Sequence, residues 1–227
     1  MVPGNPTYVF TVIDRSGSMS DIASDAEGGF NQFVADQRAL DGQCYLSLAE
    51  FDHEYTEVYV NRSLDEVPHY RIQPRGMTAL LDAIGRGITT LAGRIAVLPP
   101  DQQPGHVVFI VVTDGHENSS TEYSIARVRA LVEEKTAEGW QFMFLAAAPD
   151  AFTVGQSYGF TRTNTSSMAR GSFGQTYSVV GQSVSRQRAA ASRGLGADDV
   201  AAAAAFTDDE RAAMGGDAGH DTGTGGD

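Results

Sequence analysis

Residues 7–19 of the 227-residue chain read TYVFTVIDRSGSM, a short apolar run that ends in an aspartate and a serine-containing loop. The run from Tyr8 to Ile13 is β-branched and aromatic, which is typical of a central strand buried on both faces of a sheet. A second run, Val107 to Val112, is the most apolar in the chain and leads to Asp114. Because parallel strands open their carboxyl ends at one edge of the sheet, Asp14 and Asp114 are expected at the same edge.

The rest of the pattern alternates between strands and helices. Apolar residues recur at spacings of three and four in four segments, which predict helices over 22–40, 81–95, 125–132 and 173–184. Further strands are expected at 44–51, 55–60 and 140–146, with a short one at 160–163. The three-residue link at 52–54 indicates an antiparallel hairpin, and so a sheet edge. The pattern predicts an α/β protein with a mostly parallel sheet and one antiparallel edge strand.

The character of the sequence changes beyond about Arg186, where alanine, glycine and acidic residues dominate. We expect one domain at 1–185 and an acidic, Ala/Gly-rich, flexible tail at 186–227, because this segment offers little apolar surface to offset its ordering entropy. Residues 198–227 contain eight acidic residues and one arginine. Within this segment, Thr207 and Glu210 match a capping box, which predicts a short helix over 208–214.

The composition excludes several classes of protein. With 29 acidic against 16 basic residues and a net charge of -13, the chain lacks the clustered cations that nucleic-acid binding requires. No stretch approaches the roughly 20 apolar residues of a membrane span, and the N-terminus does not match a secretory leader. The single cysteine, Cys44, lies in an apolar run and predicts a buried thiol without a disulfide. A cytoplasmic protein is expected, and a virion component would have the same features.

Three separated pieces of chain carry oxygen-bearing side chains at strand ends or a helix start: Asp14, Ser16 and Ser18; Thr78; and Asp114. None of the five offers nitrogen or sulfur, so the set favours a hard cation, Mg²⁺ or Mn²⁺, over zinc or copper. Only two of them are charged, and three hydroxyls with two carboxylates leave a coordination position open. A metal held in this way stays electrophilic. We therefore expect it to recruit a Glu or Asp carboxylate from a partner protein.

The order and context of these five residues resemble the metal-ion-dependent adhesion site of von Willebrand factor A (VWA) domains. The resemblance covers about residues 7–185, and the stretches 14–19 and 77–82 are most similar to the intracellular bacterial and phage branch, which includes proteins similar to tellurite-resistance components. It implies a Rossmann-like, doubly wound sheet of order 3-2-1-4-5-6 with helices on both faces. It also suggests a stress-response role with an AAA ATPase or a stress-operon protein as partner.

The same resemblance assigns roles to the five residues. Ser16 and Ser18 would ligate the metal directly, whereas Asp14 and Asp114 would act directly or through water. Thr78 would be the ligand whose engagement depends on conformation.

Each piece also has a simpler interpretation when it is taken alone. The Asp-x-Ser-x-Ser run and Asp114-Gly115 suit turns, and Thr78 suits a helix N-cap. Asp21 is interpreted as a first-turn acid rather than a second cation site, and Asp82 as either a surface acid or a residue that orients the site.

Three hypotheses for function follow. The leading one is a metal-dependent protein-interaction module, an adaptor or scaffold, without enzymatic activity. A virion or assembly-apparatus structural protein is the alternative. A Mg²⁺-dependent hydrolase fits less well, because serines stand where a nucleophilic acid is expected and Arg15 is the sole nearby cation in the first loop.

Overall fold

The computed structural model describes residues 5–215, without the side chain of Ala197. Its sheet has the order β3-β2-β1-β4-β5-β6, in which β3 runs antiparallel to β2 and the other neighbours are parallel. The strands are β1 (Thr7–Asp14), β2 (Cys44–Phe51), β3 (Tyr55–Ser63), β4 (His106–Thr113), β5 (Gln141–Ala146) and β6 (Thr165–Ser167). The α/β class, the single antiparallel strand and the strand order are therefore confirmed.

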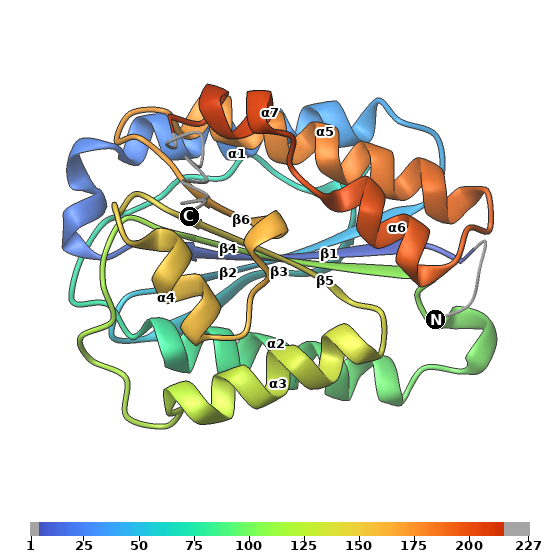
Figure 1. The fold of residues 1–227 in the computed structure, drawn as a ribbon, viewed down its shortest axis with the longest axis horizontal. Helices are drawn as coiled ribbons and strands as arrows, with labels where there is room; N and C mark the ends of the chain where they lie inside the picture. The colour runs from blue at the N-terminus through green and yellow to red at the C-terminus, as the bar shows by residue number, and fades with distance from the viewer. Residues whose placement is uncertain (1–4, 216–227) are drawn as a thin grey trace, which may run out of the picture.

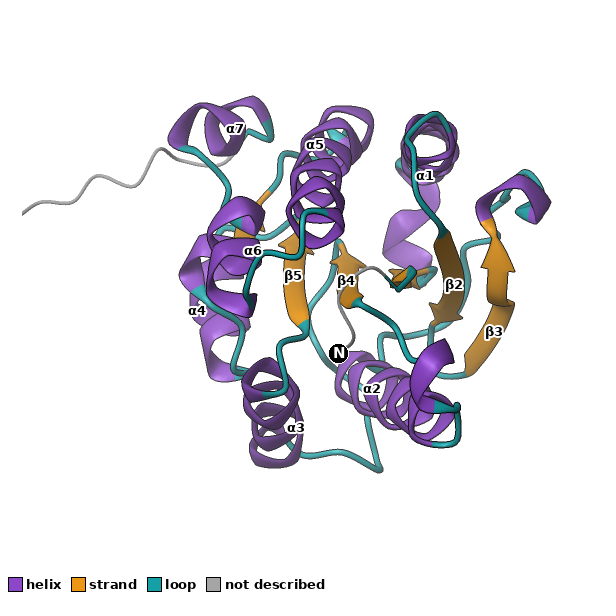
Figure 2. Cartoon of the chain, turned by 90° about the vertical axis from the view of Figure 1, so that its right-hand side faces the viewer, coloured by secondary structure: helices purple, strands orange, loops and turns teal. Residues whose placement is uncertain are grey.

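Helices cover both faces of this sheet, with α1 and α5 on one face and α2 and α3 on the other (Figures 1 and 2). Helix α4 lies beside β6, while α6 and α7 pack against α5. The helices are α1 (Ala23–Arg38), α2 (Leu80–Ala96), α3 (Ile125–Ala137), α4 (Ala151–Ser157), α5 (Phe173–Ser192), α6 (Ala197–Ala204) and α7 (Asp208–Ala213). None of them, within residues 5–215, is long and apolar enough to cross a membrane.

Strand β1 is buried on both sides, as its composition predicts. Val9 and Ile13 face the core beneath α1 and α5, and Phe10 and Val12 face the core above α2 and α3. The ring of Phe10 stacks on Phe109 of β4, with 5.4 Å between the ring centroids. This packing fixes the central strands against each other, and so it fixes the loops that follow them.

The register of the central strands brings their carboxyl ends level. Ile13 of β1 lies opposite Val112 of β4, so that Asp14 and Thr113 end neighbouring strands at the same height. On the other side of β1, Asp14 lies opposite Phe51 of β2. The loops after β1, β2 and β4 therefore leave the sheet together at its carboxyl edge.

The C-terminal segment differs from the expected flexible tail. Helix α5 continues through Arg186 to Ser192, and the following residues return over the domain as α6 and α7. Phe206 and Met214 are buried in the same core as α1 and α5. Alanine-rich helices need few large side chains to anchor them. The buried apolar residues of 198–214 are Val200, Ala204, Phe206 and Met214, which are too few to show as a wide apolar face in the sequence. The division at 185/186 stays a prediction, and residues 216–227 lie outside the described part of the chain.

Two local predictions in this half of the chain had different outcomes. The capping box is confirmed, because the Thr207 side chain accepts from Glu210 N and the Glu210 side chain accepts from Thr207 N. The strand expected at 160–163 is wrong, since a 3-10 turn occupies Arg162–Asn164 and the strand follows as β6. Phe160, which suggested a strand, instead packs its ring against Phe142 and Phe144.

Candidate metal centre

Asp14 ends β1 and is the most deeply placed of the five predicted residues. Its Oδ1 accepts from the Ser16 backbone N–H at 2.7 Å, and its Oδ2 accepts from Thr113 Oγ1 at 2.6 Å. Burial raises the pKa of Asp14 to about 6, although hydrogen bonds from Thr113 and Ser16 lower it, and the nearby charge of Asp114 raises it further. A positive charge beside this carboxylate would stabilise its ionised form.

The two serines connect the first loop to the loop after β4. Ser16 Oγ and Ser18 Oγ lie 3.0 Å apart, and Ser18 Oγ donates to Asp114 Oδ1 at 2.8 Å. Ser18 and Asp114 are 96 residues apart in the sequence, so only the parallel pairing of β1 with β4 brings them into contact.

Thr78 reaches the same place from the segment that precedes α2. Its backbone N–H donates to Asn118 Oδ1 at 2.9 Å, and its carbonyl accepts from Asn118 N at 3.0 Å. A Cβ atom built on Gly115 would lie 3.4 Å from Thr78 Oγ1 and 3.5 Å from Ser18 Oγ. The hydroxyls of Thr78 and Ser18 therefore flank one point beside Gly115. All five predicted residues are brought together at the carboxyl edge.

The loop after β4 is held to the start of α2 by two carboxylates, Asp82 and Glu117. Asp82, which the sequence left undecided, is buried and accepts from three backbone N–H groups at 2.8 to 2.9 Å, those of Thr121, Glu122 and Tyr123. Glu117 accepts from the backbone N–H groups of Leu81, Ser119 and Ser120 at 2.7 to 2.8 Å. These contacts fix Thr78 relative to Asp114.

Arg15 does not point at the oxygen cluster, although it lies between Asp14 and Ser16 in the sequence. Its guanidinium group pairs with Glu50 Oε2 at 2.9 Å and with Asp52 Oδ2 at 3.1 Å, and its side chain is 11% exposed. The backbone N–H of Arg15 also donates to the carbonyl of Phe51 at 2.8 Å. Arg15 thus ties the first loop to the end of β2.

A residue that the sequence analysis missed, Arg170, joins the site from the loop between β6 and α5. Its Nη2 donates to Asp114 Oδ2 at 2.7 Å, so both oxygens of Asp114 have partners. The Arg170 side chain is 52% exposed, whereas that of Asp114 is 0% exposed. No local pattern marks this arginine, because it is 56 residues beyond Asp114 and follows a three-residue strand.

The donor set fits a hard divalent cation. The cluster offers hydroxyl and carboxylate oxygens from separate loops, which suit Mg²⁺ or Mn²⁺. Residues 5–215 contain no group of three or more His, Cys, Asp or Glu side chains that could hold a metal ion. Any ion at this edge would therefore depend on the hydroxyls of Ser16, Ser18 and Thr78 as well as on the two aspartates.

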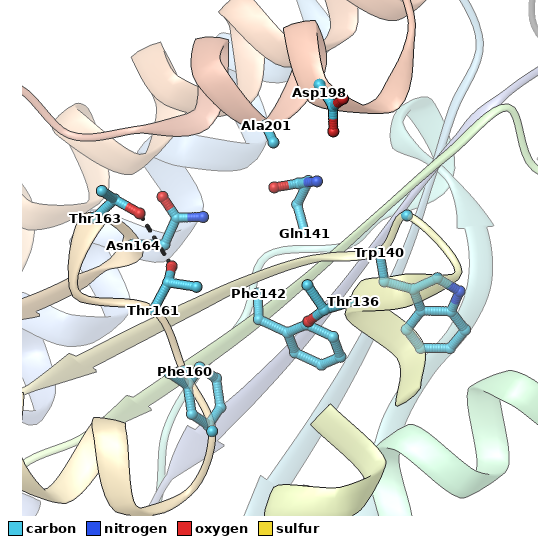
Figure 3. Close-up of a pocket in the computed structure, with 12 residues that line it drawn as sticks. Thr136, Trp140, Gln141, Phe142, Phe160, Thr161, Thr163, Asn164, Asp198 and Ala201 are labelled. Atoms are coloured by element: carbon cyan, nitrogen blue, oxygen red, sulfur yellow. Dashed lines mark hydrogen bonds between the residues drawn. The ribbon is translucent and has the colours of Figure 1, made fainter. Parts of the chain in front are cut away.

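A separate cavity of about 190 Å³ lies at the amino end of β5, beneath α6 (Figure 3). Gln141 and Asn164 turn their amide groups toward it, and Trp140 and Phe142 form part of its wall. Asn164 Oδ1 is buried without a hydrogen-bond partner among residues 5–215. Because the five predicted residues lie at the other edge of the sheet, this cavity is not part of the candidate metal centre.

Comparison with known proteins shows the fold. No protein-family profile matches the chain, and no curated protein matches it in sequence. Among solved structures, it is similar to proximal thread matrix protein 1 from the mussel byssus, with a TM-score of 0.56 and 15% identity over 81% of this chain and 47% of that one. It is also similar to the PilB minor pilin from Streptococcus sanguinis, with a TM-score of 0.56 and 13% identity over 81% of this chain and 62% of that one.

A second structure of the byssus protein, described as having a zinc-occupied metal-ion-dependent adhesion site motif, matches with a TM-score of 0.51 and 17% identity over 74% of this chain and 42% of that one. The chain thus spans between about two fifths and three fifths of the length of these three structures. Together with the strand order, the likenesses show a VWA-like fold.

Proposed function

We propose that this chain is a divalent-cation-dependent protein-interaction module that serves as an adaptor or scaffold. Asp14, Ser16, Ser18, Thr78 and Asp114 would hold Mg²⁺ or Mn²⁺, and the ion would bind a Glu or Asp of a partner protein. The observation that carries the proposal is the run of contacts from Asp14 through Ser16 and Ser18 to Asp114, which gathers oxygen atoms of two strand ends at one point.

The chemistry of the donors supports a binding role. A cation held largely by neutral hydroxyl oxygens keeps a strong attraction for an external carboxylate. Within the chain, Asp14 and Thr113 hold the first loop in place, while Asn118 and the carboxylates of Asp82 and Glu117 set the position of Thr78. The site is therefore built in advance of binding, which lowers the ordering cost of association.

The surface beside the oxygen cluster fits an acidic partner. Arg170 contacts the cluster directly, and its side chain is 52% exposed. Met77, next to Thr78, is 56% exposed and offers an apolar contact. Arg170 and Met77 therefore place a half-exposed cation and an apolar side chain at one edge of a chain whose net charge is -13. An AAA ATPase or a stress-operon protein stays the predicted partner.

The byssus protein gives independent support for the metal. Its adhesion-site motif is described as occupied by zinc, so a protein with a similar fold binds a divalent ion. For the present chain we propose Mg²⁺ or Mn²⁺, because the cluster contains no nitrogen or sulfur ligand.

The proposal is tested by capturing partner proteins from extracts of the native host on the immobilised chain, once with 5 mM MgCl₂ and once with EDTA. A roughly millimolar Mg²⁺ concentration exceeds the dissociation constant expected for a site of modest affinity. We expect a partner that the wild-type chain retains only with Mg²⁺, and that Asp14→Asn fails to retain under either condition. Asp21→Asn is the matched control, because Asp21 is exposed and follows the same loop. A partner held equally by Asp14→Asn, or equally in EDTA, would contradict a metal-dependent interaction.

A further inference from the structure

The loop that carries Arg170 is anchored on both sides, so the position of its backbone is defined. Met168 N donates to the Ala146 carbonyl at the end of β5, and Ala169 N donates to the Met214 carbonyl at the end of α7, both at 3.0 Å. On the other side, Phe173 N donates to Asp25 Oδ2 of α1 at 2.7 Å. These contacts hold the backbone of Arg170 at a fixed position from which its side chain reaches Asp114.

The contact between Arg170 and Asp114 joins a buried anion to a half-exposed cation. The carboxylate of Asp114 has no exposed surface, and its two oxygens are taken by Ser18 Oγ at 2.8 Å and by Arg170 Nη2 at 2.7 Å. Two other arginines near this edge are already paired, Arg15 with Glu50 and Asp52, and Arg75 with Asp52 and Glu54. Among residues 5–215, Arg170 is therefore the basic side chain that pairs with a carboxylate of the proposed metal centre, that of Asp114.

A divalent ion and the Arg170 guanidinium group would compete for the same carboxylate. Asp114 has to offer a lone pair to the metal, directly or through water, and that is the group to which Arg170 donates. Two cations within a few ångströms also repel each other, most strongly where the surroundings are largely dry. Because half of the Arg170 side chain already faces solvent, its guanidinium group has open space to move into when it leaves Asp114.

We propose that Arg170 is the internal counter-ion of Asp114, which a divalent cation has to displace, so that this arginine sets the metal affinity of the site. The inference rests on the proposed function and names a regulatory residue of the same site. Without metal, Arg170 neutralises Asp114 and stabilises the domain. With metal, its release leaves a guanidinium group beside the ion, where it faces an arriving acidic partner.

The test compares Arg170→Gln with the wild-type chain in two measurements. In titrations with MnCl₂ followed by calorimetry, Arg170→Gln should bind Mn²⁺ about tenfold more tightly, which corresponds to a difference of about 1.4 kcal/mol. In EDTA, the variant should melt at a lower temperature than the wild type, and saturating Mn²⁺ should remove that difference. Arg170→Lys keeps a cation in place and should stay close to the wild type in both measurements.

The control is Arg129→Gln, because Arg129 is equally exposed at 54% and pairs with Glu133 on α3 instead. It should change neither the Mn²⁺ affinity nor the melting temperature in EDTA. Equal Mn²⁺ affinity of Arg170→Gln and the wild type, or an unchanged melting temperature in EDTA, would overturn the role of Arg170 and leave the metal centre standing. No uptake of Mn²⁺ by either chain would overturn both the metal centre and this inference.

Discussion

The two edges of the sheet are organised by opposite charges. At the carboxyl edge, carboxylates accept from backbone N–H groups, as Asp82 and Glu117 do around the start of α2. At the amino edge, a cation donates to backbone carbonyls, since the buried Arg188 reaches the carbonyls of Gln37 and Gly42 at 2.7 and 2.9 Å.

Helix direction explains this difference. In a doubly wound fold, helices start at the carboxyl edge and end at the amino edge, so that free N–H groups gather at one edge and free carbonyls at the other. Acidic side chains are therefore favoured in the loops at the edge that is rich in N–H groups. Two acidic residues of this edge, Asp14 and Asp114, lie beside the hydroxyls of Ser16 and Ser18. We therefore expect the carboxyl edge to respond to divalent cations and the amino edge not to respond to them.

The largest effect is expected from Asp82→Asn at the carboxyl edge. Asp82 is buried and accepts from three backbone N–H groups, and an amide places a donor where Thr121 N now donates to Oδ2. We expect the free energy of unfolding to fall by about 3 kcal/mol, in the range for hydrogen bonds to buried charged groups. Urea unfolding measures this change.

The same variant should weaken Mn²⁺ binding, because the loop that positions Thr78 loses its anchor. Asp65→Asn is the control, since the Asp65 side chain is 84% exposed, and its effect should stay within about 0.5 kcal/mol. If Asp82→Asn were as stable as the control, the carboxylates would not be what organises this edge.

A smaller effect is expected at the amino edge, where His106 begins β4. Burial lowers the pKa of His106, while a hydrogen bond of 2.8 Å with Gln187 raises it in part. The unfolded chain therefore takes up the proton at a higher pH than the folded chain does. Stability from this group is present above the ordinary histidine pKa of about 6.5 and is lost as the pH falls through the lower folded value.

Urea unfolding at pH 7.5 and pH 5.5 checks this expectation. His106→Gln should lose less stability than the wild type between the two values, whereas His69→Gln, at an exposed position, should follow the wild type. Mn²⁺ should leave the His106 effect unchanged. A His106 contribution that depended on Mn²⁺ would break the separation between the edges.

The central fold was predictable because its signals are local. The strands that end in Asp14 and Thr113 could be predicted as buried from their apolar composition alone. The parallel register of these strands then brings together the side-chain oxygens of the predicted site residues. Asp82 could not be assigned in the same way, since its three partners lie 39 to 41 residues away in a loop without periodicity.

The parts that the sequence missed depend on distant packing. Arg170 reaches Asp114 only because β6 and α7 hold its loop, and β6 is three polar residues, Thr165–Ser167, without an apolar pattern. Helix α4, which was not predicted, is seven residues long and owes its place to contacts with β5 and β6. Helix α6 was missed for a related reason, because Phe206 and Met214 are buried as single residues rather than as a stripe, whereas α7 was predicted from its capping box.

We propose that oxygens of three loops hold one divalent ion at the carboxyl edge. Titration of the metal-free chain with MnCl₂ by calorimetry tests it most directly, with Asp14→Asn and Thr78→Val beside the exposed control Asp21→Asn. We expect one site in the wild type and the control, and an affinity at least about 100-fold lower in Asp14→Asn, a loss of about 2.7 kcal/mol. Mn²⁺ uptake that was the same in all four chains would contradict it.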